Sequence, residues 1–181
     1  MRYYVGKEFY SMGLFIDLEG LDGCGKTTQT ELLCKRFEKE NIKYKKIKLP
    51  DYESDSSILV RKYLNGDFGK NANDVNAFAA SVLFAADRFA SYTEKWKNDY
   101  QNGTLIFSDR YTPANALYQM TKLEPEEWDS YLEWLFDFEY NKIGIPEPTM
   151  VVFLDMPVEV SQKLMTSRYN GDESKKDVHE C

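Results

Sequence analysis

The stretch LFIDLEGLDGCGKTT, residues 14–28, contains an apolar run that stops at a glycine-rich turn, and a helical pattern follows at once. Gly20, Gly25, Lys26 and Thr27 occupy every fixed position of the phosphate-binding P-loop pattern, in the strand-to-helix context that the pattern requires. Such a loop turns its backbone N–H groups inward and adds the positive end of a helix, so it binds phosphate. An ordinary glycine-rich turn followed by a lysine is the weaker interpretation.

The side chains of this loop have separate expected roles. Lys26 can reach the β- and γ-phosphates of a nucleotide, and the Thr27 hydroxyl is placed to ligate Mg²⁺. We expect the loop to hold ATP through Asp22, Gly23, Cys24, Gly25, Lys26, Thr27 and Thr28.

Composition limits the partners and the compartment. The 181 residues include 23 basic and 30 acidic side chains, a net charge of −7, which argues against nucleic acid or an anionic membrane as the main partner. No apolar run approaches the roughly 20 residues of a membrane span, and the N-terminus lacks the apolar core of a signal peptide. Three widely spaced cysteines indicate reduced thiols. We therefore expect a cytoplasmic protein.

The order of elements predicts one domain of the α/β class, over residues 12–181, after an N-terminal extension at residues 1–11. Strands that alternate with helices indicate a parallel sheet covered by helices on both faces. Strands are expected at 14–18, 43–49, 104–108 and 149–154, the last two buried, and helices at 27–40, 58–64, 74–100, from Pro125 onward and at 157–167.

Apolar spacing assigns faces to two of these helices. In the long helix, capped by Asn73 or Asp74, most of the apolar stripe is expected in the core: Phe78, Val82, Ala85, Phe89 and Trp96. A dimer face is the alternative for Phe78, Val82 and Phe89. In the helix that starts at Pro125, the inward residues are expected to be Trp128, Leu132 and Leu135.

Chemistry-bearing residues follow the strands of the predicted sheet. Ligands of open parallel sheets bind beyond the carboxyl ends of the strands. There, Asp109 is suited to orient Mg²⁺ or its waters, and Arg110 to clamp a phosphate; a surface ion pair is the alternative. Phe84 and Arg88 share one face of the long helix and suit a base pocket, unless they are simply core and surface residues.

Four segments together resemble the thymidylate kinase family, most closely its clostridial branch. They are GLDGCGKTTQ at 20–29, LFAADRF at 83–89, DRYTPANALYQ at 109–119 and VFLDMP at 152–157, in the family's order and spacing. The resemblance implies a three-layer P-loop NTPase fold, transfer of the ATP γ-phosphoryl group to dTMP with Mg²⁺, and a symmetric homodimer.

The resemblance also implies the roles of individual residues. Phe84 would stack on thymine, Arg88 would bond its carbonyl edge, and Asn115 would read the ring N–H. Tyr118 would crowd the 2′ position. Asp22 would contact the acceptor sugar, and the catalytic groups would be Lys26, Asp109, Arg110 on the acceptor phosphate, and Arg168 in a lid at about 168–181.

The chain departs from the family at several positions. Gly23 and Cys24 leave the loop without the arginine that one class carries, so the lid would supply the cation, from Arg168, Lys175 or Lys176. Asp51 stands where relatives often place an arginine and would repel the acceptor phosphate unless it binds metal; Tyr52 could donate a hydrogen bond instead. A serine common before the asparagine is Ala114 here.

Two other functions fit the same motifs less well. One is a deoxynucleoside kinase or another nucleoside-monophosphate kinase. The other is a nucleotide-binding module without turnover.

Overall fold

The computed structural model describes residues 2–5 and 8–168, with the backbone alone described at residues 2–5, 8–11, 165, 167 and 168. A parallel sheet lies at its centre, with strand order β4-β5-β3-β6. Its strands are β3 (Phe15–Glu19), β4 (Tyr44–Lys48), β5 (Leu105–Asp109) and β6 (Met150–Phe153). This confirms the predicted sheet and places β3, which leads into the P-loop, between β5 and β6.

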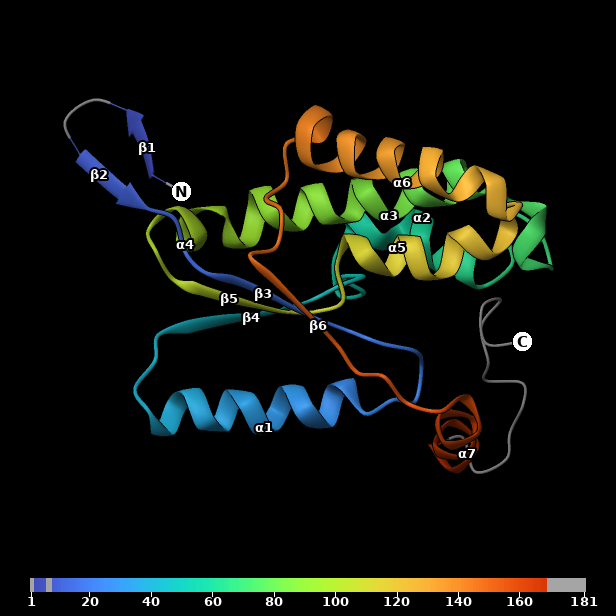
Figure 1. Ribbon diagram of the computed structural model, residues 1–181, viewed down its shortest axis with the longest axis horizontal. Helices are drawn as coiled ribbons and strands as arrows, with labels where there is room; N and C mark the ends of the chain where they lie inside the picture. The colour runs from blue at the N-terminus through green and yellow to red at the C-terminus, as the bar shows by residue number, and fades with distance from the viewer. Residues whose placement is uncertain (1, 6–7, 169–181) are drawn as a thin grey trace.

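Helices cover both faces of the sheet (Figure 1). One face carries α1 (Lys26–Lys39) and α7 (Val158–Arg168). The other carries α2 (Ile58–Leu64), α3 (Ala77–Ser91), α4 (Lys97–Gln101), α5 (Thr112–Gln119) and α6 (Trp128–Phe136). The three-layer P-loop NTPase fold is therefore confirmed.

Irregular helix and a hairpin complete the described chain. The π-helical segment Tyr92–Trp96 joins α3 to α4, so the predicted long helix is continuous through Gln101. A second π-helical segment, Asp137–Ile143, continues α6. Short 3₁₀ turns lie at Asp55–Ser57, Ala72–Asp74, Met120–Lys122 and Pro125–Glu127. Near the N-terminus, β1 (Arg2–Val5) pairs antiparallel with β2 (Glu8–Ser11) in a sheet of their own.

Alternation along β3 divides the core into two. Phe15 faces the α3 side, where its ring meets Trp96 and Tyr111 edge to face at centroid distances of 5.3 and 4.8 Å. Leu18 faces α1 and packs with Cys34 and Phe107. Asp17 and Glu19 lie two and four residues after Phe15, so the same alternation turns both carboxyl groups inward on the α3 side.

The long helix differs from its predicted cap and core. Its cap is Asn76, whose side chain accepts a hydrogen bond from Ala79 N at 2.8 Å, because residues 72–74 form a separate 3₁₀ turn. Ala85 and Trp96 are buried as expected. Phe78, Val82 and Phe89 are 41, 42 and 46% exposed, so the prediction that most of the stripe is core was wrong. Phe78 meets the rings of Tyr131 and Trp134 on α6 edge to face, at centroid distances of 5.5 and 4.7 Å, and does not reach the sheet core.

Two further burial predictions were wrong. Trp128 is 40% exposed at the first residue of α6, where its indole N–H donates to Met120 O and Leu123 O, and Tyr131 joins Leu135 in the core instead. The apolar strand β6 is 38–54% exposed at each residue. It pairs with β3 alone in the described sheet and is therefore an edge strand.

Within the described residues, none of the helices combines the length and apolar character needed to cross a bilayer.

Candidate nucleotide site

The P-loop leaves β3 and enters α1 through glycines that the geometry requires. Gly20 has a φ of 148°, and a Cβ there would lie 2.6 Å from Cys24 Sγ and 3.0 Å from the Leu154 carbonyl oxygen. Gly25 caps α1 with a φ of 92°. A side chain at Gly20 would therefore clash, and one at Gly25 would strain the turn that opens the helix.

The Lys26 ammonium folds back over its own loop. Lys26 Nζ donates to the carbonyl oxygens of Gly20 and Leu21, both at 2.8 Å, and lies 3.8 Å from Cys24 Sγ. Burial, together with the charge of Arg110, lowers the pKa of Lys26. The ammonium group is thus held at the loop, where an incoming phosphate can replace the carbonyl partners.

Asp22 links the P-loop to the end of β5. It forms an ion pair with Arg110 and accepts a hydrogen bond from Tyr118 OH at 2.7 Å. Burial raises the pKa of Asp22, but the Arg110 charge and the Tyr118 hydrogen bond outweigh burial and lower it overall. Arg110 Cζ also lies 5.1 Å from the centroid of the Tyr118 ring. Three predicted site residues therefore meet, although 88 and 96 residues separate Arg110 and Tyr118 from Asp22.

The chain turns sharply between β5 and α5. Arg110 has a φ of 74°, a left-handed conformation uncommon outside glycine, and its N–H donates to Leu18 O at 3.2 Å. Strained backbone of this kind persists where surrounding structure fixes it. The turn directs Arg110 to Asp22, while Asp109, 4% exposed, has Lys48 Nζ at 3.9 Å.

The predicted metal ligands are Thr27 and Asp109. Thr27 is exposed at the start of α1, and Asp109 is buried at the end of β5. Over the described ranges, no group of three or more His, Cys, Asp or Glu side chains is arranged to hold a metal. A metal at Thr27 and Asp109 stays a prediction.

The predicted base-reading residues converge on a carboxylate that the sequence did not single out. Arg88 donates from Nε and Nη2 to the two oxygens of Glu139, each at 2.6 Å. Asn115 Nδ2 and Thr112 Oγ1 donate to the same carboxylate at 3.2 and 2.9 Å. Glu139 is completely buried, and its charge outweighs the effect of burial on the pKa of Arg88, which is raised. Arg88 is therefore a buried ion pair and not a surface group.

Phe84 lies one turn before Arg88 on α3 and is half-buried. Its ring meets the Tyr63 ring edge to face, with centroids 6.0 Å apart. Lys122 Nζ in turn donates to Tyr63 OH at 2.7 Å. Phe84 is thus backed by a neighbouring aromatic ring and is not a core residue.

Asp17 and Glu19 are two neighbouring buried carboxyl groups that the sequence analysis did not single out. Both are completely buried on β3, and Glu19 Oε1 accepts from Tyr111 N at 2.9 Å. Burial, and next the Glu19 charge, raise the pKa of Asp17 to about 9. Both Asp17 oxygens and Glu19 Oε2 have no hydrogen-bond partner among the described residues, so burial favours the protonated, neutral form of Asp17.

Asp51, the acidic residue expected to repel phosphate, lies in the loop after β4 and is paired with a lysine of the π-helical segment after α3. Asp51 forms an ion pair with Lys95, and its N–H donates to Asp87 Oδ2 at 2.8 Å. Asp87, 1% exposed, also accepts from Ser56 Oγ at 2.6 Å and so fixes the loop to α3. Tyr52, 43% exposed, stands at the surface of this loop. The charge of Asp51 is therefore offset by the protein itself.

The predicted lid lies largely outside the described residues. Arg168 is the last residue of α7, with only its backbone described, and Lys175 and Lys176 fall beyond the described ranges. The described part of α7 approaches the P-loop, because Ser161 Oγ donates to Asp22 O at 2.8 Å.

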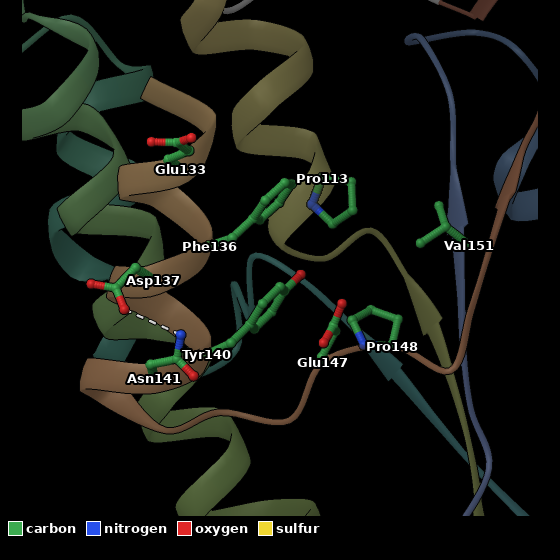
Figure 2. A pocket seen from close by; sticks show the side chains of 9 residues that line it. All are labelled: Pro113, Glu133, Phe136, Asp137, Tyr140, Asn141, Glu147, Pro148 and Val151. Atoms are coloured by element: carbon green, nitrogen blue, oxygen red, sulfur yellow. Dashed lines mark hydrogen bonds between the residues drawn. The ribbon is translucent and has the colours of Figure 1, made fainter. Parts of the chain in front are cut away.

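A cavity of about 420 Å³ lies apart from these residues, between the start of α5, the π-helical segment after α6, and β6 (Figure 2). Phe136 and Tyr140 stack with ring centroids 5.6 Å apart, and both point toward Pro113 and Pro148. None of the predicted nucleotide-binding residues lines this cavity.

Fold and site together define a P-loop nucleotide kinase: a phosphate loop after the first strand of the parallel sheet, joined by Asp22 to an arginine at the end of β5. The profile of the thymidylate kinase family matches residues 18–181. This chain belongs to the thymidylate kinase family.

Individual relatives agree. A probable thymidylate kinase of Thermococcus gammatolerans is 32% identical over 161 residues, which are 87% of this chain and 72% of the relative. Thymidylate kinase of Mycobacterium tuberculosis is 27% identical over 160 residues, 88% of this chain and 73% of that protein. The structure of the Candida albicans thymidylate kinase matches with a TM-score of 0.63 at 26% identity, covering 84% of this chain and 67% of that one. The clostridial branch stays a prediction.

Proposed function

We propose that this protein transfers the γ-phosphoryl group of ATP to dTMP and forms dTDP and ADP. Membership in the thymidylate kinase family carries the proposal. The contact of Asp22 with Arg110 and Tyr118 supports it, because it joins the donor loop to the acceptor side. Neither alternative, another nucleoside or nucleotide kinase or a silent binding module, is favoured by a specific observation.

ATP binds in the proposed site at the P-loop. Gly23, Cys24, Gly25 and Thr28 supply backbone N–H groups, and Lys26 moves from the Gly20 and Leu21 carbonyls to the phosphates. The Thr27 hydroxyl and the Asp109 carboxylate are the hard oxygen ligands that Mg²⁺ prefers, so this donor set fits the metal. When bound, Mg²⁺ would offset charge on the β- and γ-phosphates.

The acceptor dTMP occupies the space between α3, α5 and the loop after β4. Phe84 stacks on the base, Arg88 bonds its carbonyl edge, and Asn115 reads the ring N–H. Tyr118 crowds the 2′ position. Their origin on α3 and α5, which hydrogen bond through Asn115 Nδ2 and Ser81 O at 3.4 Å, supports one shared pocket.

The phosphate end of dTMP lies at the catalytic residues. Arg110 holds the acceptor phosphate, Asp22 contacts the sugar, and Tyr52 donates from the loop after β4. Because its pKa is lowered, Asp22 stays ionised and can orient Arg110. A phosphate monoester has a second pKa near 6 and arrives mostly as the dianion, so no general base is needed. Catalysis is then positioning and charge neutralisation, with Lys26 and the lid residue Arg168 acting on the transferred group.

Release of ADP tests the function directly. In an assay that couples ADP release to a colour change, we expect turnover with dTMP and Mg²⁺, and slower turnover with dUMP, dCMP and thymidine. Preference for thymidine would place the enzyme among nucleoside kinases instead. Thermal stabilisation by dTMP or ATP without any dTDP would leave a binding module.

We also propose a homodimer in the cytoplasm, without nucleic-acid or membrane partners. Phe78, Val82 and Phe89 support the dimer, because they expose an apolar stripe along α3. The net charge of −7 is consistent with the absence of polyanionic partners.

A further inference from the structure

Glu139 is saturated as a hydrogen-bond acceptor. Oε1 receives Arg88 Nη2 at 2.6 Å and Asn115 Nδ2 at 3.2 Å, and Oε2 receives Arg88 Nε at 2.6 Å and Thr112 Oγ1 at 2.9 Å. The carboxylate is completely buried and stands on the π-helical segment after α6, far along the chain from its partners. A buried charge with four donors fixes the orientation of each donor.

This contact decides which end of the Asn115 amide faces the pocket. Its two neighbours are the Glu139 carboxylate and the Ser81 carbonyl oxygen, and both can only accept. The NH₂ end of the amide must therefore point to them, and the Oδ1 end is left as an acceptor. No described residue donates to Asn115 Oδ1.

The same contact decides which part of Arg88 remains available. Its Nε and Nη2 atoms are both held by Glu139. Nη1, which carries two N–H groups, has no partner within the described part of the chain. Arg88 thus offers donors only, beside an Asn115 that offers an acceptor.

We propose that Glu139 is a positioning residue that sets the hydrogen-bonding polarity of the base pocket: it holds Arg88 as donor and Asn115 as acceptor. The inference rests on the proposed placement of the base between Phe84, Arg88 and Asn115. Thymine and uracil present a carbonyl acceptor at position 4 and an N–H donor at position 3, which match this pair. Cytosine presents the reverse, so it would leave buried groups unpaired on both sides.

Polarity can be separated from shape by comparing dTMP with 5-methyl-dCMP, which keeps the 5-methyl group but reverses the donor and acceptor at positions 3 and 4. With the unaltered protein we expect kcat/KM to favour dTMP by at least about 100-fold. In Glu139→Gln the new amide can donate to Asn115 Oδ1, so only the 3.4 Å contact with Ser81 O still holds the NH₂ end of Asn115 away from the base. We expect the preference to fall by at least about 10-fold, mainly through a higher KM for dTMP.

Thr112→Val is the matched control, because it removes one donor to Glu139 without touching Arg88 or Asn115. We expect lower thermal stability with the preference unchanged. A ratio of two substrates does not depend on the folded fraction, so a merely structural role of Glu139 would leave it unchanged in Glu139→Gln as well. That result would overturn the inference and leave the pocket standing.

Lack of preference in the unaltered protein would instead contradict the proposed pocket. If Glu139→Gln does not fold, Glu139→Asp tests whether Glu139 positions Arg88 and Asn115. It keeps an acceptor-only carboxylate but is shorter, so we expect a several-fold higher KM for dTMP with the preference retained. An unchanged KM for dTMP would overturn the inference.

Discussion

At the scale of single residues, charged groups lie in two kinds of place in this protein: at the phosphate loop and in the interior. Lys26 and Arg110 hold positive charge at the loop: phosphate can replace the carbonyl partners of Lys26, and Asp22 orients Arg110. Glu139 and Asp17 are carboxyl groups in the interior, and each is kept there by a different device. Glu139 is paired with Arg88, whereas burial and the neighbouring Glu19 raise the pKa of Asp17 to about 9.

Lys26→Ala should lower kcat by about 100-fold or more, because it removes charge stabilisation made mainly in the transition state. Steady-state kinetics with dTMP and MgATP measure the effect. Lys35→Ala, at an exposed position on α1, is the control and should retain normal turnover. Near-normal turnover of Lys26→Ala would refute the catalytic role of the loop.

Arg88→Ala should both weaken dTMP binding and destabilise the fold. The substitution leaves Glu139 buried and unpaired, and loss of one partner of a buried ion pair costs about 3–5 kcal/mol. Urea unfolding measures the stability, and titration of the folded protein measures the affinity. A folded variant with unchanged dTMP affinity would remove Arg88 from the pocket.

Asp17→Asn should stabilise the protein increasingly as the pH rises from about 4 to 9. The pKa of Asp17 is about 9 in the folded state against 3.8 ordinarily, so over this interval the folded chain binds more protons than the unfolded chain. Stability from this group therefore falls with rising pH, and the neutral amide escapes that loss. Thermal unfolding at pH 4, 7 and 9 measures the difference, and an equal gain at all three values would contradict the raised pKa of Asp17.

At the scale of elements, the π-helical segments matter most. The first carries Trp96 into the core beside Phe15, and the second turns Glu139 inward between α3 and α5. Such segments occur often at functional sites. If these segments were regular α-helix, every residue after them would be rotated differently about the helix axis. The π-helical segments therefore decide which side chains reach the pocket.

Asn76→Ala should destabilise the protein by about 1 kcal/mol, because it removes the N-cap of α3. Asn73→Ala is the matched control and should change little, because Asn73 is exposed in the turn before the helix. Chemical denaturation of both variants provides the comparison. A larger effect at Asn73 would move the start of the helix back to the position that the sequence alone predicted.

At the scale of the whole molecule, apolar surface gathers on α3 and on β6. Phe78, Val82 and Phe89 are exposed on the helix, and β6 is an exposed edge strand with four apolar residues. Contiguous apolar surface of this kind marks an interface. The homodimer proposed above would bury the stripe on α3.

Val82→Glu combined with Phe89→Glu should convert the proposed homodimer to a monomer, because the substitutions would introduce like charges at its two-fold interface. Light scattering after size-exclusion chromatography measures the mass. Leu32→Glu is the control, since Leu32 is equally exposed but lies on α1, across the sheet. A monomeric unaltered protein would refute the dimer.

The sequence by itself determined the P-loop, the order of strands and helices, and the family, because each depends on neighbouring residues with fixed spacing. It also named the three residues that meet at Asp22: Arg110 from its place at the end of a parallel strand, and Asp22 and Tyr118 from the family resemblance. Only the tertiary structure decided that Arg88 pairs with Glu139, 51 residues away, and that Asp17 and Glu19 are both completely buried. Ion pairs between residues far apart in the chain, and the removal of carboxyl groups from water, depend on how the helices pack. The local spacing of apolar residues does not predict either of them. For the same reason the stripe on α3 was predicted as core, although packing left it exposed.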